Sequence, residues 1–236
     1  PQECDLLIVA SPKSDWIPAE REALLKYIAH GGRALILLDP HIQGVDIPDF
    51  ADDLRVYGVT VGADLVMEAD RNHLEINEAN EPLQFYYGSN FSMHSILELR
   101  DGMWAIQFAR SVQFEAPEAG GQEGRTLIEA SQMSWAEESM EISPDAPPSP
   151  DPDEAAGRIG MAALVEITHP HFLIEDAPKD AAGRLVVFGD SDFATNQLSS
   201  LARNGDIFLN AVAWLVGEDD QLGQREDGEA QFFVLS

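Results

Sequence analysis

The fold is decided by residues 5–40, which run DLLIVASPKSDWIPAEREALLKYIAHGGRALILLDP. Two apolar runs, residues 5–12 and 33–40, have the length and composition of buried strands. Between them, residues 18–32 have helical periodicity, with a proline at the first helical position and Gly31 where a left-handed residue ends a helix. Apolar strands joined by a helix predict a right-handed βαβ unit, in which the two strands are parallel.

The same pattern continues along the chain. The sequence predicts a helix around 50–57 that ends near Gly58, strands at 63–67, 161–167 and 185–190, and a helix at 205–218 with Asp206 as N-cap and Gly217 as its end. Residues 70–135 differ, because they hold most of the aromatic side chains in alternating runs that are typical of strands. We therefore expect an α/β fold with a mainly parallel sheet and a β-rich insert.

We expect residues 1–218 to form a single α/β domain, with a β-rich middle part at about 70–140. Residues 141–157 hold five prolines and several acids, a composition that predicts a mobile loop. Residues 219–236 form an acidic tail that leads toward a missing segment. The chain begins with proline and has no initiator methionine, so we expect it to be a fragment whose absent flanks carry membrane or targeting segments.

The formal net charge of -28 excludes several classes of partner. With 42 acidic residues against 14 basic ones, contacts to nucleic-acid phosphates are not expected, and an anionic membrane surface would repel the domain. The acidity fits either a salt-adapted source or a GC-rich genome with an acidic loop and tail. Cys4 is the single cysteine, so no intrachain disulfide can form, and we expect it to be a small, half-buried apolar residue.

The candidate site is the turn Gly-Asp-Ser-Asp at 189–192, which follows a predicted strand. Asp190, Ser191 and Asp192 would lie at the carboxyl end of that strand, where open α/β sheets bind ligands, and Asp39 ends another strand in the same way. We expect one of the two aspartates of the turn to cap the following helix. The other would stabilise neighbouring loops or face a shallow polar cleft beside Asp39.

A serine hydrolase is the alternative use of this turn, because one class of esterase carries its nucleophile in Gly-Asp-Ser. Ser191 would then need a base within hydrogen-bond reach. No histidine follows Ser191, and the last two in the chain are His169 and His171. Amidotransferase chemistry is disfavoured too, because Cys4 precedes the first strand instead of lying at a strand-to-helix elbow.

Other chemical groups favour structural roles. His169-Pro170-His171 could chelate a metal, but the spacing is ordinary and there is no second cluster of histidine or cysteine, so we expect no metal and no cofactor. Aromatic residues in strands usually pack in the core or across strands. We expect this of Trp104, Trp135, Tyr86 and Tyr87, which could otherwise line a binding surface, whereas Asn196 and Asn210 would satisfy loop or helix groups.

Residues 5–40, together with GRLVVFGDSDFATN (183–196) and NGDIFLNAVAWLVGE (204–218), resemble the auxiliary component of uncharacterised and gliding-motility ABC transporters. The resemblance implies a three-layer α/β sandwich related to the class I glutamine amidotransferase (flavodoxin-like) fold, without its catalytic residues. A similar domain occurs as a structural module in an intraflagellar transport protein. Family members usually carry membrane helices on both sides of this domain, which implies a bacterial or archaeal membrane-anchored protein whose soluble part lies outside the cytoplasm.

The resulting hypothesis is a non-catalytic domain of an ABC transporter auxiliary protein. It would bind permease or ATPase subunits, other components of the membrane complex, or a ligand, through Asp39, Asp190, Ser191 and Asp192. The rival hypotheses are a hydrolase that uses Ser191 and a purely structural scaffold.

Overall fold

The computed structural model describes residues 4–14, 16–40, 50–76, 82–88, 94–97, 103–118, 120–139 and 149–218. Its helices are α1 (Pro18–Ala29), α2 (Phe50–Asp53) and α3 (Asn204–Val216). Its 3-10 turns are η1 (Leu54–Tyr57), η2 (Arg71–His73), η3 (Ser95–Leu97), η4 (Pro170–Phe172) and η5 (Asp192–Ala194).

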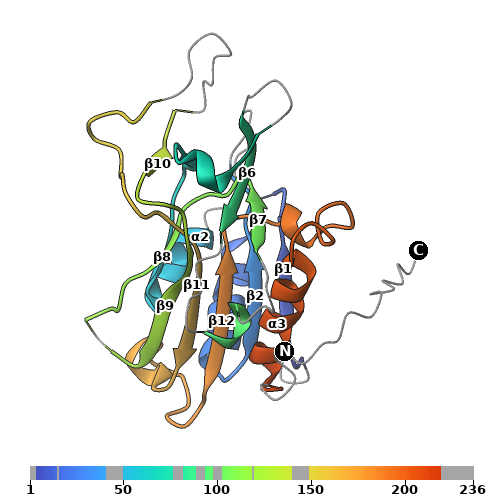
Figure 1. Ribbon diagram of the computed structural model, residues 1–236. Helices are drawn as coiled ribbons and strands as arrows, with labels where there is room; N and C mark the ends of the chain where they lie inside the picture. The colour runs from blue at the N-terminus through green and yellow to red at the C-terminus, as the bar shows by residue number, and fades with distance from the viewer. Residues whose placement is uncertain are drawn as a thin grey trace.

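The strands of the described residues form one large and two small sheets (Figure 1). The large sheet has the order β1 (Leu7–Ala10), β2 (Arg33–Leu37), β12 (Gly183–Phe188), β11 (Gly160–Ile167), β8 (Val112–Phe114), β3 (Val59–Val61), and β9 (Gln122–Glu129) also pairs with β11. The small sheets pair β10 (Ser134–Glu137) with β4 (Leu65–Glu68), and β5 (Leu74–Ile76) with β6 (Pro82–Gly88) and β7 (Trp104–Gln107).

The predicted βαβ unit is confirmed. β1 pairs in parallel with β2, and β2 pairs in parallel with β12, so three strands run side by side in one direction. Pro18 begins α1, and the Glu20 carboxylate accepts the Ile17 N–H at 3.0 Å. Gly31 follows the helix with a φ of +90°, the left-handed conformation expected where a helix ends.

Helices cover both faces of these parallel strands. Alternate side chains of β2 and β12 point to opposite faces, as strand geometry requires. Ala34, Ile36 and Leu185 pack with Leu24 and Ile28 of α1 in one core cluster. In the other cluster, the β2 and β12 residues Leu35, Leu37, Val186 and Phe188 pack with the α3 residues Ile207, Ala211, Trp214 and Leu215.

The rest of the large sheet is mixed. β11 is antiparallel to β12 and β9, but parallel to β8, which in turn is antiparallel to β3. The α/β class is therefore confirmed, with parallel strands at β1–β2–β12 and at β8–β11. The β-rich middle of the chain supplies β5, β6, β7 and β10, which lie toward one end of the molecule with β4 (Figure 1).

Some predicted boundaries change. The predicted helix at 50–57 is α2 continued by η1, and it ends at Gly58 with a φ of +81°. The last helix begins at Asn204, so Asp206 lies in its first turn and the prediction that Asp206 is the N-cap was wrong. Of the predicted mobile loop, residues 141–148 lie outside the described residues, whereas Ala155 and Gly157 make backbone hydrogen bonds to β10. The tail at 219–236 also lies outside the described residues.

Candidate functional site

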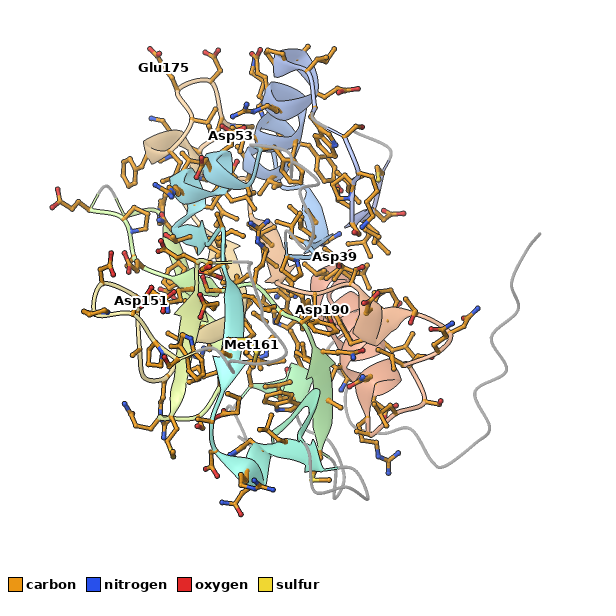
Figure 2. All side chains as sticks on the ribbon, turned by 90° about the horizontal axis from the view of Figure 1, so that it is seen from above. Asp39, Asp53, Asp151, Met161, Glu175 and Asp190 are labelled. Carbon is orange, nitrogen blue, oxygen red and sulfur yellow. The ribbon has the colours of Figure 1, made fainter. Side chains whose placement is uncertain are left out.

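Polar residues from several strand ends meet at one edge of the large sheet. Because β1, β2 and β12 are parallel, Ser11, Asp39 and Asp190 follow them at the same edge. Because β8 runs in the opposite direction, Arg110, which precedes it, lies there as well, and its N–H donates to the Gly189 carbonyl at 2.8 Å. Figure 2 shows Asp39 and Asp190 close together near the middle of the molecule. We call this edge the carboxyl edge.

Asp39 joins the ends of β1, β2 and β12. Its Oδ1 accepts the backbone N–H of Ser191 at 2.8 Å. Its Oδ2 accepts the Ser11 hydroxyl and the Lys13 ammonium, the latter at 3.0 Å. Burial of Asp39 works to raise its pKa, but the hydrogen bonds from Ser11, Ser191 and Lys13 outweigh burial and hold the pKa below its ordinary value. Asp39 is therefore ionised, and its hydrogen bond holds the turn that contains Ser191 in place.

Asp190 caps the turn that follows β12. Its side chain is 1% exposed, and its two oxygens accept the N–H groups of Asp192 at 2.9 Å and Phe193 at 3.2 Å. The predicted capping role of one aspartate is therefore filled by Asp190, although the capped element is the single 3-10 turn η5 and not a helix. Burial, together with the charges of Asp192 and Asp39, raises the pKa of Asp190 to about 7, against the opposing effect of the two backbone donors.

Asp192 is the exposed carboxylate of this group. Its partial burial and the charge of Asp39 raise its pKa, whereas Lys13 acts in the opposite direction. Asp192 uses its backbone N–H for Asp190 and its carbonyl for the Thr195 hydroxyl, so both main-chain groups of this residue are held in place. The carboxyl edge therefore presents an exposed acid on a fixed backbone, beside the half-buried Ser191.

Ser11 has an unusual backbone conformation. Its φ of +43° lies in the left-handed region, which non-glycine residues seldom adopt. The conformation is held by the Ser11 N–H, which donates to the Leu37 carbonyl at 2.9 Å, and by the bond from its hydroxyl to Asp39. Such strain persists only where the surroundings impose it, and it gathers at functional sites.

The sequence did not predict Arg110, which lies between β7 and β8 and is 4% exposed. Its Nε donates to the Gly62 carbonyl at 2.7 Å, whereas its buried Nη1 has no hydrogen-bond partner. Burial lowers the pKa of Arg110 against the opposing charges of Asp64, Asp39 and Asp52. The sequence does contain a sign of this role, because Arg110 is the one basic residue in the alternating run WAIQFARSVQF (104–114). The interpretation of this run as strands gave Arg110 no special role.

The structure does not bring the two candidate histidines to Ser191. β11 and β12 are antiparallel, with Ile167 beside Gly183 and Ala162 beside Phe188. Ser191 follows the end of β12, so His169 and His171, which follow β11, lie at the opposite edge of the sheet. The length of a strand therefore separates the serine from these two potential bases.

The histidine pair packs with an aromatic neighbour. The rings of His169 and His171 lie 6.1 Å apart, and both contact the ring of Phe172. Within the described ranges, no group of three or more histidine, cysteine, aspartate or glutamate side chains is arranged to hold a metal ion.

The other singled-out residues have mostly structural surroundings. Trp104 and Trp135 are buried, as expected of strand aromatics, and Tyr86 and Tyr87 lie in β6 opposite β7. The Asn210 amide donates to the Ile96 carbonyl at 3.1 Å. Cys4 is exposed, so the expectation of a half-buried cysteine was wrong, because the residue precedes β1 and lies outside the core.

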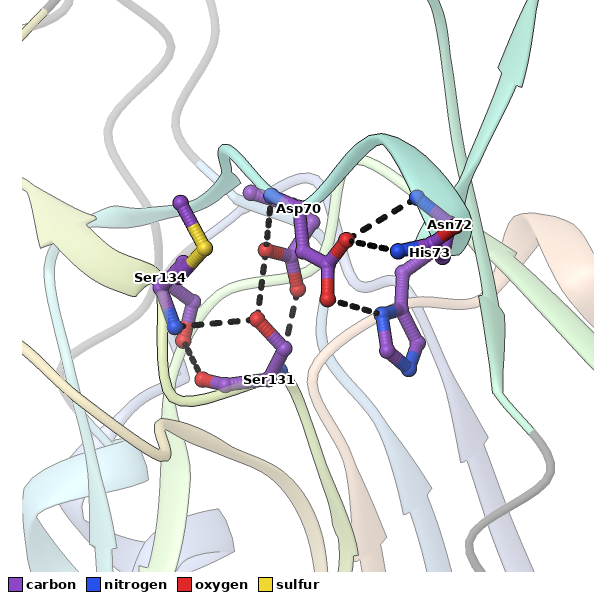
Figure 3. A network of polar contacts seen from close by, with 7 residues as sticks. Asp70, Asn72, His73, Ser131 and Ser134 are labelled. Atoms are coloured by element: carbon purple, nitrogen blue, oxygen red, sulfur yellow. Dashed lines mark hydrogen bonds and ion pairs between the residues drawn. The ribbon is translucent and has the colours of Figure 1, made fainter.

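A second polar network, also missed from the sequence, lies at the end of β4 (Figure 3). The Glu68 carboxylate accepts the N–H of Asp70 at 2.8 Å, the N–H of Ser131 at 2.9 Å and the Ser131 hydroxyl at 2.7 Å. Asp70 in turn accepts the N–H of Asn72 and lies 3.2 Å from Nδ1 of His73. This network connects β4 to the turn between β9 and β10.

Comparisons with known proteins found one family model and similar solved structures. A family model described as ABC-type uncharacterized transport system matches residues 1–211. The solved structure of the mmIFT52 N-terminal domain is similar over 98% of this chain and 81% of that one, with 17% identity and a TM-score of 0.60. A ThuA-like protein from Bacteroides uniformis aligns over 90% of this chain and 69% of its own, with 16% identity and a TM-score of 0.35.

No curated protein matches the sequence. Among the described residues, no helix has both the length and the apolar character that crossing a membrane requires. The likeness to the mmIFT52 N-terminal domain concerns the fold alone, because the identity is low.

Proposed function

The chain belongs to the family of ABC-type uncharacterized transport systems, and from this premise we propose that it is a non-catalytic auxiliary domain that binds a partner subunit at the carboxyl edge. The permease and ATPase subunits of the same transporter are the expected partners. Asp39 and Asp190 shape the binding turn from within, and Ser191 and Asp192 present its outer surface.

The observation that carries this proposal is the fixed geometry of the turn. Two carboxylates, Asp39 and Asp190, accept three consecutive backbone N–H groups, those of Ser191, Asp192 and Phe193. A turn held in this way loses little conformational entropy when a partner binds it, so its contacts contribute fully to affinity. An ordered, exposed acidic turn is thus suited to recognising a partner of complementary charge.

The same contacts support a non-catalytic role. The Ser191 backbone is tied to Asp39, and the candidate bases His169 and His171 lie at the opposite edge of the sheet. We expect no turnover of activated esters above that of a Ser191→Ala variant. Turnover that disappears in this variant would establish the hydrolase instead.

Co-purification tests the proposed binding role. The full-length protein, expressed with its transporter subunits, should retain them on an affinity column, and Asp192→Ala should reduce their recovery. Glu123→Ala is the matched control, because it removes one exposed acid from β9 and should leave recovery unchanged. Equal recovery with both variants would favour a structural scaffold or a binding surface elsewhere.

We also propose that residues 1–218 fold as one three-layer α/β unit with amidotransferase-like topology, which the packing of α1 and α3 on opposite faces supports. The domain would lie outside the cytoplasm and reach the membrane through segments beyond the present sequence. Protease added to spheroplasts, from which any outer membrane barrier has been removed, should then cleave the domain, whereas complete protection, lost on lysis, would place it inside the cytoplasm.

A further inference from the structure

Arg110 carries a buried positive charge, and not all of its hydrogen-bond donors have an acceptor within the fold. The side chain is 4% exposed, and of its guanidinium nitrogens Nε is bound to the Gly62 carbonyl while Nη1 has no acceptor. A buried guanidinium with an unmet donor is costly, because burial removes its hydration and no acceptor replaces the lost water at that donor.

The nearby carboxylates act on Arg110 through their charge, but their oxygens are engaged with other donors. Asp64 accepts the N–H of Ser111 at 2.7 Å and the Ser111 hydroxyl at 2.6 Å. Asp39 accepts Ser11, Lys13 and the N–H of Ser191. These charges oppose the effect of burial without overcoming it.

Two glycines shape the surroundings of this arginine. A Cβ atom on Gly189 would lie 2.1 Å from the Arg110 carbonyl oxygen and 3.2 Å from its Cγ, so the turn after β12 packs closely against Arg110. On the other side, Nε is fixed by Gly62, which follows β3. The side chain is therefore held across the carboxyl edge from β12 to β3, with its terminal nitrogens left for another group.

From these contacts we propose that Arg110 binds an oxyanion, a carboxylate or phosphate group of a small ligand, through the terminal nitrogens of its guanidinium at the carboxyl edge. Arginine pairs with such groups by two parallel hydrogen bonds, and burial strengthens charge-assisted bonds. Because a net charge of -28 disfavours anions over the surface as a whole, the proposed binding depends on Arg110 itself and not on long-range attraction. This ligand site does not depend on the transporter partner proposed above.

The test measures the thermal midpoint of the domain against increasing inorganic phosphate, and separately acetate, at ionic strength held constant with sodium chloride. A ligand that binds the folded state raises the midpoint in a saturable way. We expect saturation for the wild type and for the control Arg125→Gln, which loses an exposed arginine on β9. For Arg110→Gln, the anion concentration that gives half-saturation should be higher by about tenfold or more. This is the loss of affinity expected when one charge-assisted hydrogen bond is removed.

Comparison of phosphate with acetate shows whether the site prefers a phosphate or a carboxylate group. The preferred group is that of the anion whose effect saturates at the lower concentration. If Arg110→Gln does not fold, the Nε–H resonance of Arg110 in the wild type replaces the variant, and it should shift with the same half-saturation as the midpoint. The proposal is overturned if neither anion gives a saturable response in the wild type, if Arg110→Gln responds like Arg125→Gln, or if the Arg110 resonance stays fixed.

Discussion

The turn after β4 and the turn after β12 are each held by a buried carboxylate, Glu68 and Asp190, and the two differ in what surrounds that carboxylate. In the network of Figure 3, Glu68 accepts three donors from Asp70 and Ser131 and joins β4 to the β9–β10 turn. At the carboxyl edge, Asp190 accepts two donors from its own turn, and two further carboxylates, Asp39 and Asp192, lie close enough to raise its pKa.

The difference distinguishes a carboxylate with a structural role, Glu68, from a pair of carboxylates, Asp39 and Asp190, that order a surface turn. Glu68 binds segments that are 63 residues apart in the chain, so its contribution is tertiary stability. Asp39 likewise joins segments that are far apart in the chain, but together with Asp190 it orders a turn that carries the exposed Asp192, and this gathering of like charges costs stability. A fold that keeps such a cluster next to a left-handed serine has features typical of a functional site.

The largest expected effect is the pH dependence that the raised pKa of Asp190 gives to stability. Because its folded pKa, about 7, is above the ordinary value of 3.8, the folded state holds the proton more tightly than the unfolded state. Its contribution to stability is therefore complete below pH 4 and is lost as pH rises to about 7. The free energy of unfolding of the wild type, relative to Asp190→Asn, should fall by up to about 4 kcal/mol over this range.

Chemical denaturation at a series of pH values measures this difference, with Glu123→Gln, which replaces an exposed acid of β9, as the matched control. If the difference in the free energy of unfolding between the wild type and Asp190→Asn does not change with pH, the proposed electrostatic difference between the Glu68 and Asp190 turns is contradicted.

The next effect concerns Glu68. Glu68→Ala leaves the N–H groups of Asp70 and Ser131 and the Ser131 hydroxyl without their acceptor, which should lower the free energy of unfolding by about 2–3 kcal/mol. Urea denaturation gives the value. Recovery of transporter subunits by the folded variant should match the wild type, and a loss of recovery would mean that this network also serves binding.

A smaller effect is expected for Asp39→Asn. The variant loses charge-assisted bonds from Ser11, Lys13 and Ser191, which should cost about 1–2 kcal/mol at neutral pH. It also removes a charge that raises the pKa of Asp190, so the pH-dependent loss described above should move to lower pH. A pH profile that keeps its position would show that Asp39 and Asp190 do not interact.

The smallest effect on stability is expected for Asp192→Ala. The side chain is exposed, and the backbone bonds of the turn remain, so the free energy of unfolding should change by less than about 0.5 kcal/mol. A larger loss, measured by urea denaturation, would assign Asp192 to the structural part of the turn.

The sequence predicts the carboxyl edge because local pattern and chain direction are sufficient there. Continuous apolar runs identify β1, β2 and β12, and parallel strands place the residues that follow them at one edge. Asp39 and Asp190 could therefore be brought together from patterns alone. A capping role for one of the two aspartates of the turn could be predicted as well, because an aspartate side chain readily accepts backbone N–H groups at the start of a helical turn.

The features that the sequence missed depend on contacts between distant segments. α3 begins at Asn204, whose side chain bonds both backbone groups of Ala105, 99 residues away, so Asp206 lies in the first turn and is not the N-cap. Arg110 owes its burial to loops from β3 and β12, and Glu68 owes its role to Ser131. Local periodicity carries no information about such pairs, so composition alone gives these residues no special role.

The central claim, that the turn after β12 contacts a transporter subunit, is tested most directly by site-specific photo-cross-linking in intact cells. A photoreactive amino acid replaces Asp192 in one full-length variant and the exposed Glu123 of β9 in the other. We predict a cross-linked product with a permease or ATPase subunit from position 192 and none from position 123. Cross-linking from position 123 alone, or from neither position while the subunits still co-purify, would contradict the claim.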